Sequence, residues 1–423
     1  MRWNGCSMLN PSTGGGGARA VGRCILLGRA PYSDLEDALY RGYLTPAYWA
    51  SQTRVREWME EAGMTVHVDP AANLVGRYEG SDPEAPCLII GSHLDSVRDA
   101  GCFDGPLGIM LGVEVVAALS AAGRRMPFPI EVYAFGDEEG SRFPAAMLTS
   151  RAVAGTLQPA QLDVADAEGV RLLDAGVELS AYLDAAKRPG TVLAYLEAHI
   201  EQGPVLEAND IAIGTVTGIA AQLRYAVKVR GTAGHAGTTA MGLRKDALAG
   251  AAAMILAVEQ TASAAASAVV ATVGRIEARP GAPNVICGEV SFSLDIRSGD
   301  QDRRDEAARL ILGQLSDLAA GRNLEIEIEL VHDLPASPCD PHLMRLMDEA
   351  SAAAGCAPFR LVSGAGHDAM VMAAICPTVM LFIRCRGGVS HNPAEHVDPA
   401  DAEAAAVAML GFVERLGANH DRA

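Results

Sequence analysis

Short apolar segments alternate with longer apolar ones along much of the chain. Positions 87–90 and 130–135 have the length and composition of buried strands, and positions 107–122 between them are long enough for a helix. This helical segment is apolar nearly all round, so we expect it to be buried. The order strand, helix, strand predicts an α/β fold, with an open, mostly parallel sheet and helices on both of its faces.

Positions 214–332 follow a different pattern. Between 290 and 297 apolar and polar residues alternate strictly, as in a strand with one covered face. The stretch predicts a ferredoxin-like α+β unit with four strands and two helices. The strands are expected at 223–230, 269–276, 285–296 and 324–331, and the helices at 243–263, after the first strand, and at 302–320, before the last. The α/β pattern then resumes, with a strand at 379–383 and a final helix at 400–416. We therefore expect the unit to be inserted into one larger domain made of residues 1–213 and 333–423.

Composition narrows the class of protein. The 423 residues contain 34 Lys and Arg against 52 Asp and Glu, and the net charge of -18 argues against a nucleic-acid or membrane-surface partner. An acidic substrate would need locally placed arginines. The nine cysteines form no CxxC pair, and neither a secretory leader nor a membrane-length apolar run is recognisable, so we expect a cytoplasmic protein with reduced thiols. Residues 1–20 are polar and glycine-rich, which predicts a loose extension.

Residue types that bind metals follow the strand predicted at 87–90. The segment GSHLDS comes directly after it, GCFDGPLG follows within one loop, and His93 and Asp104 are thus both expected at this edge of the sheet. Asp95 is placed to accept the second ring proton of His93. A neutral imidazole and a carboxylate suit zinc, manganese or a similar divalent ion. The alternative interpretation is that His93 only caps a turn.

Further candidates follow other apolar segments. GDEEGSRF comes after the strand at 130–135 and holds three acids in sequence, Asp137, Glu138 and Glu139. Adjacent carboxylates repel, which favours a bound cation with one acid as ligand and its neighbour as proton acceptor; an acidic surface loop is the alternative. Carboxyl ends of parallel strands meet at one edge of a sheet. The sequence therefore predicts a metal site there, made of His93, Asp104, Glu139, His199 and His391.

The joint set of motifs resembles the amidase, hydantoinase and carbamoylase branch of the two-metal aminoacylase and carboxypeptidase superfamily. This branch includes N-carbamoyl-L-amino-acid hydrolases, allantoate amidohydrolases and β-ureidopropionases. The resemblance extends from about Tyr32 to Leu416 and rests on GSHLDS, DGPLG, DEEGSRF, EAHIEQGP, GHAGTT, PNV, DIRS, SGAGHDA and SHNPAE. It implies a hydrolase that cleaves the ureido (N-carbamoyl) C–N bond of a small carboxylate substrate, with a zinc-exopeptidase-like catalytic domain.

The resemblance also implies a role for each ligand. Asp104 would bridge two divalent ions per subunit, zinc or manganese, with cobalt or nickel accepted in vitro. His93 and His199 would complete the ligands of one ion, and Glu139 and His391 those of the other. Glu138 would be the general base, which takes a proton from water and passes it to the leaving nitrogen.

The same resemblance implies the substrate contacts. His235 would stabilise the tetrahedral oxyanion, and Asn284 would contact the substrate. Arg297 would pair with the substrate carboxylate, and a solvated arginine on a strand face is the alternative. Gln202 is expected to hydrogen-bond the ureido group, and the loop around Gly366 to offer backbone donors.

A homodimer through the inserted domain is also implied, with His235 and Asn284 reaching into the partner's site. The strands at 269–276 and 223–230 favour such pairing, because their edges are expected to stand unpaired.

Two departures from the family pattern and two alternative functions stay open. Ala240 stands where proline usually follows GHAGTT, and Met370 stands where SGAGHDA often continues with glutamine. An aminoacylase or dipeptidase would share the metal ligands, but EQGP and SGAGHDA argue against it. A catalytically silent binding protein would be expected to have lost a ligand or Glu138, and every one of these positions is filled.

Overall fold

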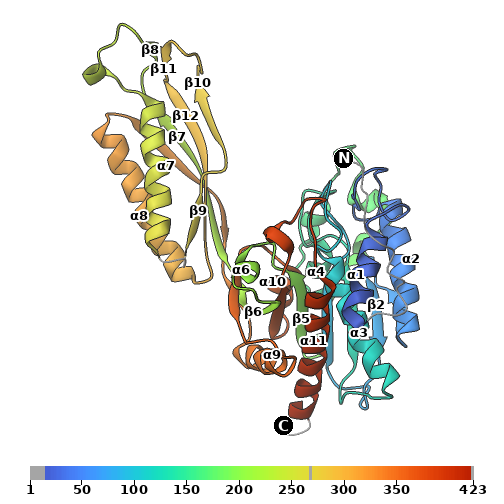
Figure 1. Cartoon of the computed structure of the whole chain (residues 1–423). Coiled ribbons are helices and arrows are strands. Elements are labelled where there is room, and N and C mark those ends of the chain that lie inside the picture. The colour runs from blue at the N-terminus through green and yellow to red at the C-terminus, as the bar shows by residue number, and fades with distance from the viewer. Residues whose placement is uncertain (1–14, 266–268, 421–423) are drawn as a thin grey trace. The chain divides into compact units, whose positions relative to one another are not determined.

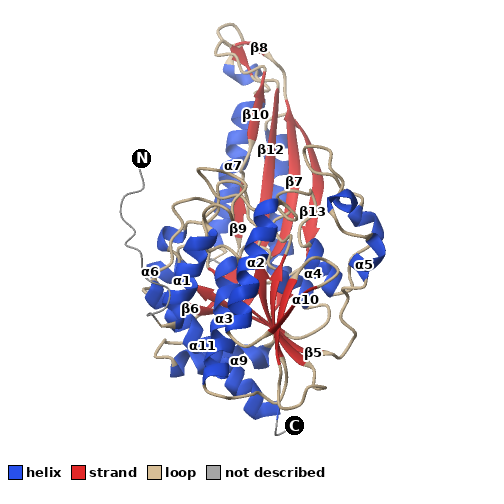
Figure 2. Ribbon diagram, turned by 90° about the vertical axis from the view of Figure 1, so that its right-hand side faces the viewer, coloured by secondary structure: helices blue, strands red, loops and turns tan. Residues whose placement is uncertain are grey.

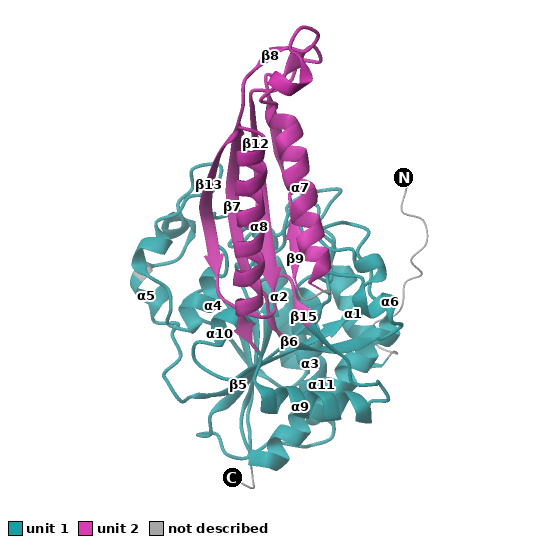
Figure 3. Cartoon of the chain, turned by 90° about the vertical axis from the view of Figure 1, so that its left-hand side faces the viewer, with its two compact units in different colours: residues 1–217, 339–361, 366–423 teal, residues 218–338, 362–365 magenta. Residues whose placement is uncertain are grey.

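The computed structural model describes residues 15–265 and 269–420. The chain divides into two compact units, which Figures 1 and 3 show. Unit 1 is discontinuous and consists of residues 1–217, 339–361 and 366–423. Unit 2 consists of residues 218–338 and 362–365.

Unit 1 is built on a mixed sheet. Its strands run in the order β1 (Thr65–Val68), β2 (Leu74–Tyr78), β4 (Ile130–Phe135), β3 (Cys87–His93), β5 (Val192–Ile200), β16 (Thr378–Ile383) and β6 (Ile213–Ile219). The short strands β14 (Ser337–Pro338) and β15 (Arg360–Ser363) pair with β6. Strands β4, β3, β5 and β16 pair in parallel, and the outer pairs are antiparallel. The expected α/β fold is confirmed, and its parallel part is the centre of the sheet.

The central strands are covered on both faces. Every residue of β3, β4 and β16 is buried, which is the pattern of strands with helices on either side. Helix α3 (Pro106–Ala121) packs on β3, β4 and β5, and helices α1 (Gly16–Leu27) and α11 (Pro399–His420) pack on α3 in turn (Figure 2). The expectation that α3 is buried is therefore confirmed. The remaining helices of unit 1 are α2 (Pro46–Glu61), α4 (Leu148–Val153), α5 (Leu179–Leu183), α6 (Val205–Ala208), α9 (Pro341–Ala353) and α10 (Asp368–Met372).

The prediction that residues 1–20 form a loose extension is wrong for its last residues, because α1 begins at Gly16. Gly17 lies directly on α11, where its N–H donates to Glu403 Oε2 (2.6 Å) and an added Cβ would come within 2.1 Å of Glu403 N. Arg19 forms an ion pair of 2.6 Å with the buried Glu114. The glycines therefore allow close helix packing. Residues 1–14 lie outside the described residues.

Unit 2 contains a five-stranded antiparallel sheet. The order is β10 (Ile276–Arg279), β12 (Glu289–Ser298), β7 (Ala221–Arg230) and β13 (Glu325–Leu334), and β9 (Val270–Thr272) also pairs with β12. The strand expected at 269–276 is thus replaced by two short strands on the same edge of β12. Between them, Arg275 N donates to Ser293 Oγ (3.1 Å) and Ser293 N donates to Arg275 O (3.0 Å). The expectation of an edge at 223–230 is wrong, since β7 lies between β12 and β13.

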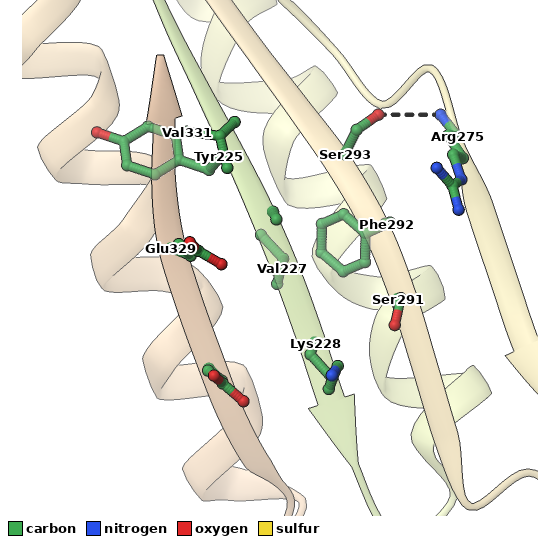
Figure 4. A pocket seen from close by; sticks show the side chains of 11 residues that line it. Tyr225, Val227, Lys228, Arg275, Ser291, Phe292, Ser293, Glu329 and Val331 are labelled. Carbon is green, nitrogen blue, oxygen red and sulfur yellow. Dashed lines mark hydrogen bonds between the residues drawn. The ribbon is translucent and has the colours of Figure 1, made fainter. Parts of the chain in front are cut away.

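The two faces of this sheet differ. The inward residues of β12 and one side of α7 (Ala247–Ala264) and α8 (Gln301–Gly321) form a common core, which confirms the alternation predicted for this strand. The opposite face is polar and slightly hollowed, and Figure 4 shows Lys228, Ser291 and Glu329 lining it. By length and composition α7 would be able to cross a membrane, but in unit 2 its buried side packs in this core.

Candidate metal centre

The predicted ligands of unit 1 gather at the carboxyl edge of the four parallel strands. His93 is the last residue of β3, and His199 is the last but one of β5. Glu139 follows β4, and His391 follows β16. Asp104 lies in the segment between β3 and α3, where Gly105 passes so close to His93 that an added Cβ would lie 2.5 Å from the imidazole ring. Since neighbouring strands end at one edge, segments far apart in the sequence meet there.

His93, Asp104 and His199 form a buried group of three possible ligands. Asp104 Oδ1 lies 3.1 Å from His199 Nε2 and 3.5 Å from His93 Nε2, and the two Nε2 atoms are 3.4 Å apart. The Nδ1 atoms face the main-chain carbonyls of Asp95 (3.1 Å) and Ile200 (2.9 Å). A carbonyl only accepts, so each Nδ1 carries a proton and each Nε2 is directed at the shared point, as a metal ligand requires.

The charge of this group favours a cation. Burial lowers the pKa of His93, but the neighbouring carboxylates of Asp104 and Asp95 outweigh this effect and raise the pKa well above its usual value. Burial raises the pKa of Asp104, yet His199 and His93 hold it well below its usual range. Asp104 Oδ1 is buried and accepts no hydrogen bond. The donor set therefore fits a divalent metal ion.

Asp104 also belongs to a second group, with Glu139 and His391. His391 Nε2 lies 3.4 Å from Asp104 Oδ2 and 3.3 Å from Glu139 Oε1. The hydrogen bond to Glu139 raises the pKa of His391 to about 8. Ser390 Oγ (2.6 Å) and Gln202 Nε2 (2.9 Å) donate to the same Oδ2. Asp104 thus presents one oxygen to each group, which is the arrangement of a bridging carboxylate.

Asp95 positions both glutamates of the site. Its Oδ1 accepts the N–H of Glu138 (3.1 Å), and its Oδ2 accepts that of Glu139 (3.2 Å). The same carboxylate lies 3.5 Å from His93 Nδ1. Burial raises the pKa of Glu138 well above its usual value. His93, Glu138 and Glu139 form a third possible ligand group, so both glutamates lie within reach of a metal ion.

Gln202 and His391 share an unusual backbone. Their φ angles are 57° and 54°, in the left-handed region that non-glycine residues rarely adopt. Such conformations concentrate at functional sites, where the surroundings enforce them. The amide nitrogen of Gln202 donates to Asp104 and Ser390, while its amide oxygen is buried without a hydrogen-bond partner. This oxygen is therefore able to accept a hydrogen bond from a substrate N–H.

The sequence analysis missed several residues that support the ligands. Glu395 accepts the main-chain N–H groups of Phe103 (2.7 Å) and Asp104 (3.1 Å). Glu197 accepts hydrogen bonds from Ser92 Oγ (3.2 Å) and Ala369 N (2.9 Å). A usable signal existed for Glu197, which is a charged residue inside the apolar strand β5. Glu395 lies in SHNPAE, where only the histidine was singled out.

Gly366 lies in unit 1 next to the buried His367. The ring centroid of His367 is 4.5 Å from that of His199, in an edge-to-face contact. Burial and the neighbouring His199 hold the pKa of His367 well below its usual value, so this ring is neutral. The SGAGHDA loop thus reaches the first metal-ligand group.

Two predicted residues of unit 2 lie together. Strand β8 (Gly234–His235) pairs with β11 (Val285–Ile286), and Ala236 N donates to Asn284 O (3.0 Å). The side chains of His235 and Asn284 belong to exposed residues. His235 Nδ1 accepts the N–H of Gly237 (3.1 Å), which leaves Nε2 as the proton-bearing atom.

Arg297 does not belong to the β8–β11 strand pair. It pairs with Gln222 near the start of β7, whereas His235 follows the end of β7, so the two residues lie at opposite ends of the sheet. Arg297 Nε and Nη2 bind the carboxylate of Asp295 (2.7 and 3.1 Å), and Nη1 donates to Gly364 O.

Known proteins resemble this chain over most of its length. The model of peptidase family M20/M25/M40 matches residues 89–415. N-carbamoyl-L-amino acid amidohydrolase from Geobacillus stearothermophilus is 42% identical over 86% of this chain and 89% of its own. Allantoate deiminase 1 from Glycine max is 39% identical over 94% of this chain and 89% of its own.

Solved structures agree with these relatives. An amidase of the hydantoinase/carbamoylase family from Burkholderia multivorans is 33% identical and has a TM-score of 0.88, with 94% of this chain and 97% of that chain covered. The resemblance inferred from the motifs is therefore confirmed, and the chain belongs to peptidase family M20/M25/M40.

Proposed function

We propose that the chain hydrolyses the ureido C–N bond of a small carboxylate substrate, such as an N-carbamoyl-L-amino acid or allantoate. The observation that carries this proposal is the position of Asp104, which gives one oxygen to each of two ligand groups beside Glu138. Relatives named for N-carbamoyl-L-amino acids and for allantoate supply the substrate class.

Two divalent ions, zinc or manganese, would be held by five residues. His93, His199 and Asp104 would bind one ion, and Asp104, Glu139 and His391 the other. When bound, such a pair acidifies water and polarises the carbonyl group under attack. Asp95 keeps Glu138 and Glu139 in place through their main-chain N–H groups.

Glu138 would carry the proton. Its carboxylate takes a proton from the attacking water, whose oxygen forms a bond with the ureido carbon. When the C–N bond breaks, the same carboxyl group delivers the proton to the leaving nitrogen. The raised pKa of the buried Glu138 suits this task, because burial makes its carboxylate a stronger proton acceptor than an exposed one.

The substrate would be oriented by the polar groups that the family resemblance implies. The unpartnered amide oxygen of Gln202 accepts a ureido N–H, and main-chain groups around Gly366 donate to the substrate. Arg297 exchanges its contact with Asp295 for the substrate carboxylate. Asp295 keeps Arg224 Nε (2.8 Å) as a partner when this happens, which lowers the cost of the exchange.

The enzyme would work as a homodimer that pairs through unit 2. Strand β13 has a free edge among the described residues and carries two exposed apolar side chains, Leu330 and Val331. In a dimer with two-fold symmetry, His235 and Asn284 of each subunit would enter the active site of the other subunit. There His235 would stabilise the oxyanion. We also infer a cytoplasmic location, since the cysteines among the described residues are free thiols.

A panel of substrates tests the reaction. The metal-loaded protein is assayed for ammonia release from N-carbamoyl-L-amino acids, N-carbamoyl-β-alanine, allantoate and ureidoglycolate, and for amine release from N-acetyl-L-amino acids and dipeptides. Turnover of a ureido acid is expected. Faster turnover of acetylated acids or dipeptides would identify an aminoacylase or dipeptidase, and a lack of any turnover with metals bound would favour a binding protein.

A further inference from the structure

Two methionine side chains from different segments flank Gly366. A Cβ added at Gly366 would lie 2.9 Å from Met147 Cε and 3.6 Å from Met370 Sδ. The shorter distance is well inside van der Waals contact, so the methyl group of Met147 fills the space that a side chain at position 366 would need. The absence of a side chain there lets the SGAGHDA loop lie directly against both thioethers.

Met147 is held beside the proposed general base by a strained backbone. It precedes α4 with a φ of 61°, and methionine rarely adopts this left-handed conformation. Its N–H donates to the main-chain carbonyl of Glu138 (3.1 Å). Strain of this kind is often retained at functional sites, and here it occurs at a residue whose main chain is bonded to Glu138 and whose side chain reaches Gly366.

Met370 follows the loop and lies in α10. Its N–H donates to His367 O (3.1 Å), and the ring of His367 contacts the ligand His199. Ala369 is buried, whereas Met370 is partly exposed. Met370 is therefore partly open to solvent, and His367 connects it to the candidate ligand His199.

We propose that Met147 and Met370 form the wall that receives the α-substituent of the ureido acid, and that the preferred substituent is unbranched and apolar. This inference rests on the proposed ureido hydrolysis. Methionine side chains are flexible and polarisable and adapt to apolar groups of varied length. Their sulfur is at best a weak hydrogen-bond acceptor. Allantoate carries a second ureido group in place of an apolar chain, and its N–H and C=O groups would lose hydrogen bonds to water against this wall.

Three substrates test the preference. The metal-loaded enzyme is assayed with N-carbamoyl-L-norleucine, N-carbamoylglycine and allantoate. We expect kcat/KM for the norleucine derivative to exceed both others by about tenfold or more. An equal or higher value for allantoate or for the glycine derivative would overturn the inference while leaving ureido hydrolysis intact. If none of the three is hydrolysed, the proposed function fails and the inference fails with it.

Matched variants assign the preference to the two side chains. Met370→Gln and Met147→Gln should each lower the norleucine-to-allantoate ratio of kcat/KM by about tenfold, whereas Met370→Leu and Met147→Leu should keep its order. Binding gives a second readout: N-carbamoyl-L-norleucine should bind the inactive Glu138→Gln protein about tenfold more tightly than a protein that also carries Met370→Gln. An unchanged ratio and affinity in the Met370→Gln proteins would overturn the inference, even if Met147→Gln, at a buried position, fails to fold.

Discussion

Glu395 holds the main chain of Asp104, although the two residues are 291 positions apart: Glu395 Oε1 accepts the N–H of Asp104 at 3.1 Å. Gly101 makes this approach possible, since an added Cβ there would lie 2.3 Å from Glu395 Cβ. Glu395 shares its segment with His391. The contact therefore joins the loop that carries Asp104, the proposed bridging carboxylate, to the loop that carries His391, a candidate ligand of the second group.

Replacing Glu395 should weaken metal binding. In Glu395→Ala the N–H groups of Phe103 and Asp104 lose their acceptor, and we expect metal affinity to fall by about 10–100-fold, as for other residues that orient ligands. Glu395→Gln retains an acceptor oxygen of the same reach and should retain most of the affinity. Both affinities are measured by titration with a competing chelator. Wild-type affinity in Glu395→Ala would show that the loop is held by other contacts.

Glu138 and Glu139 should respond differently to the same substitution. Glu138→Gln removes the proton carrier and should lower kcat by at least about 100-fold, while both metals stay bound. Glu139→Gln removes a ligand and should reduce metal content to about one ion per subunit. Metal analysis by mass spectrometry and steady-state kinetics distinguish the two variants. Loss of metal in Glu138→Gln instead would mean that the two roles are reversed, as the third ligand group allows.

Mixing two inactive proteins tests the shared site. In a mixed dimer of Glu138→Gln and His235→Ala subunits, one site contains an intact Glu138 and receives an intact His235 from its neighbour. Statistical exchange should therefore restore about a quarter of the wild-type activity. A mixture of His235→Ala with the double variant serves as the control and should stay inactive. An active monomer, or no activity after proven exchange, would place His235 in the site of its own chain.

The ion pairs of Glu131, a residue of β4, should make the free energy of unfolding depend on pH. Glu131 accepts hydrogen bonds from Arg77 Nη1 (2.9 Å) and Lys187 Nζ (2.6 Å). Burial raises the pKa of Glu131, but these cations outweigh it and hold the pKa below its usual value. Its folded-state pKa is thus below the unfolded one, so the stabilisation is present above about pH 4.5 and is lost as the pH falls through the folded pKa.

Glu131→Gln isolates this contribution. At pH 7 the variant should melt about 1–2 °C below the wild type, which corresponds to roughly 1 kcal/mol for a protein of this size. The difference should shrink as the pH falls through the folded-state pKa of Glu131, because the wild-type carboxylate then also becomes neutral. Thermal unfolding followed by circular dichroism measures both proteins. A difference that stays constant with pH would mean that packing, and not charge, is lost in the variant.

The central strands and the clustering of the candidate ligand residues were predictable from the sequence for one physical reason. Strands buried on both faces are apolar along their whole length, as in β4, and polar residues at their carboxyl ends then stand out. His93 and Glu139 were visible in this way. The buried α3 was equally visible, because it has no polar face.

Other features depend on contacts between segments that lie far apart in the sequence, so no short stretch of the sequence indicates them. The interruption between β9 and β10 depends on the main-chain bonds of Arg275 to Ser293 on another strand. The glycines of α1 look like those of a flexible tail until α11 is seen against Gly17. Glu395 is one acid among many in the sequence, and its role becomes visible only when the loop of Asp104 is folded over it.

The most direct test of the central claim is the metal dependence of ureido cleavage. Ammonia release from an N-carbamoyl-L-amino acid is measured for the protein as purified, after removal of metal by a chelator, and after addition of zinc or manganese, with folding followed by circular dichroism. We predict that chelation abolishes ammonia release, that two equivalents of metal per subunit restore it, and that the spectrum changes little, because the ligands lie at the edge of an apolar core. Full activity in a protein shown to be free of metal would contradict the account.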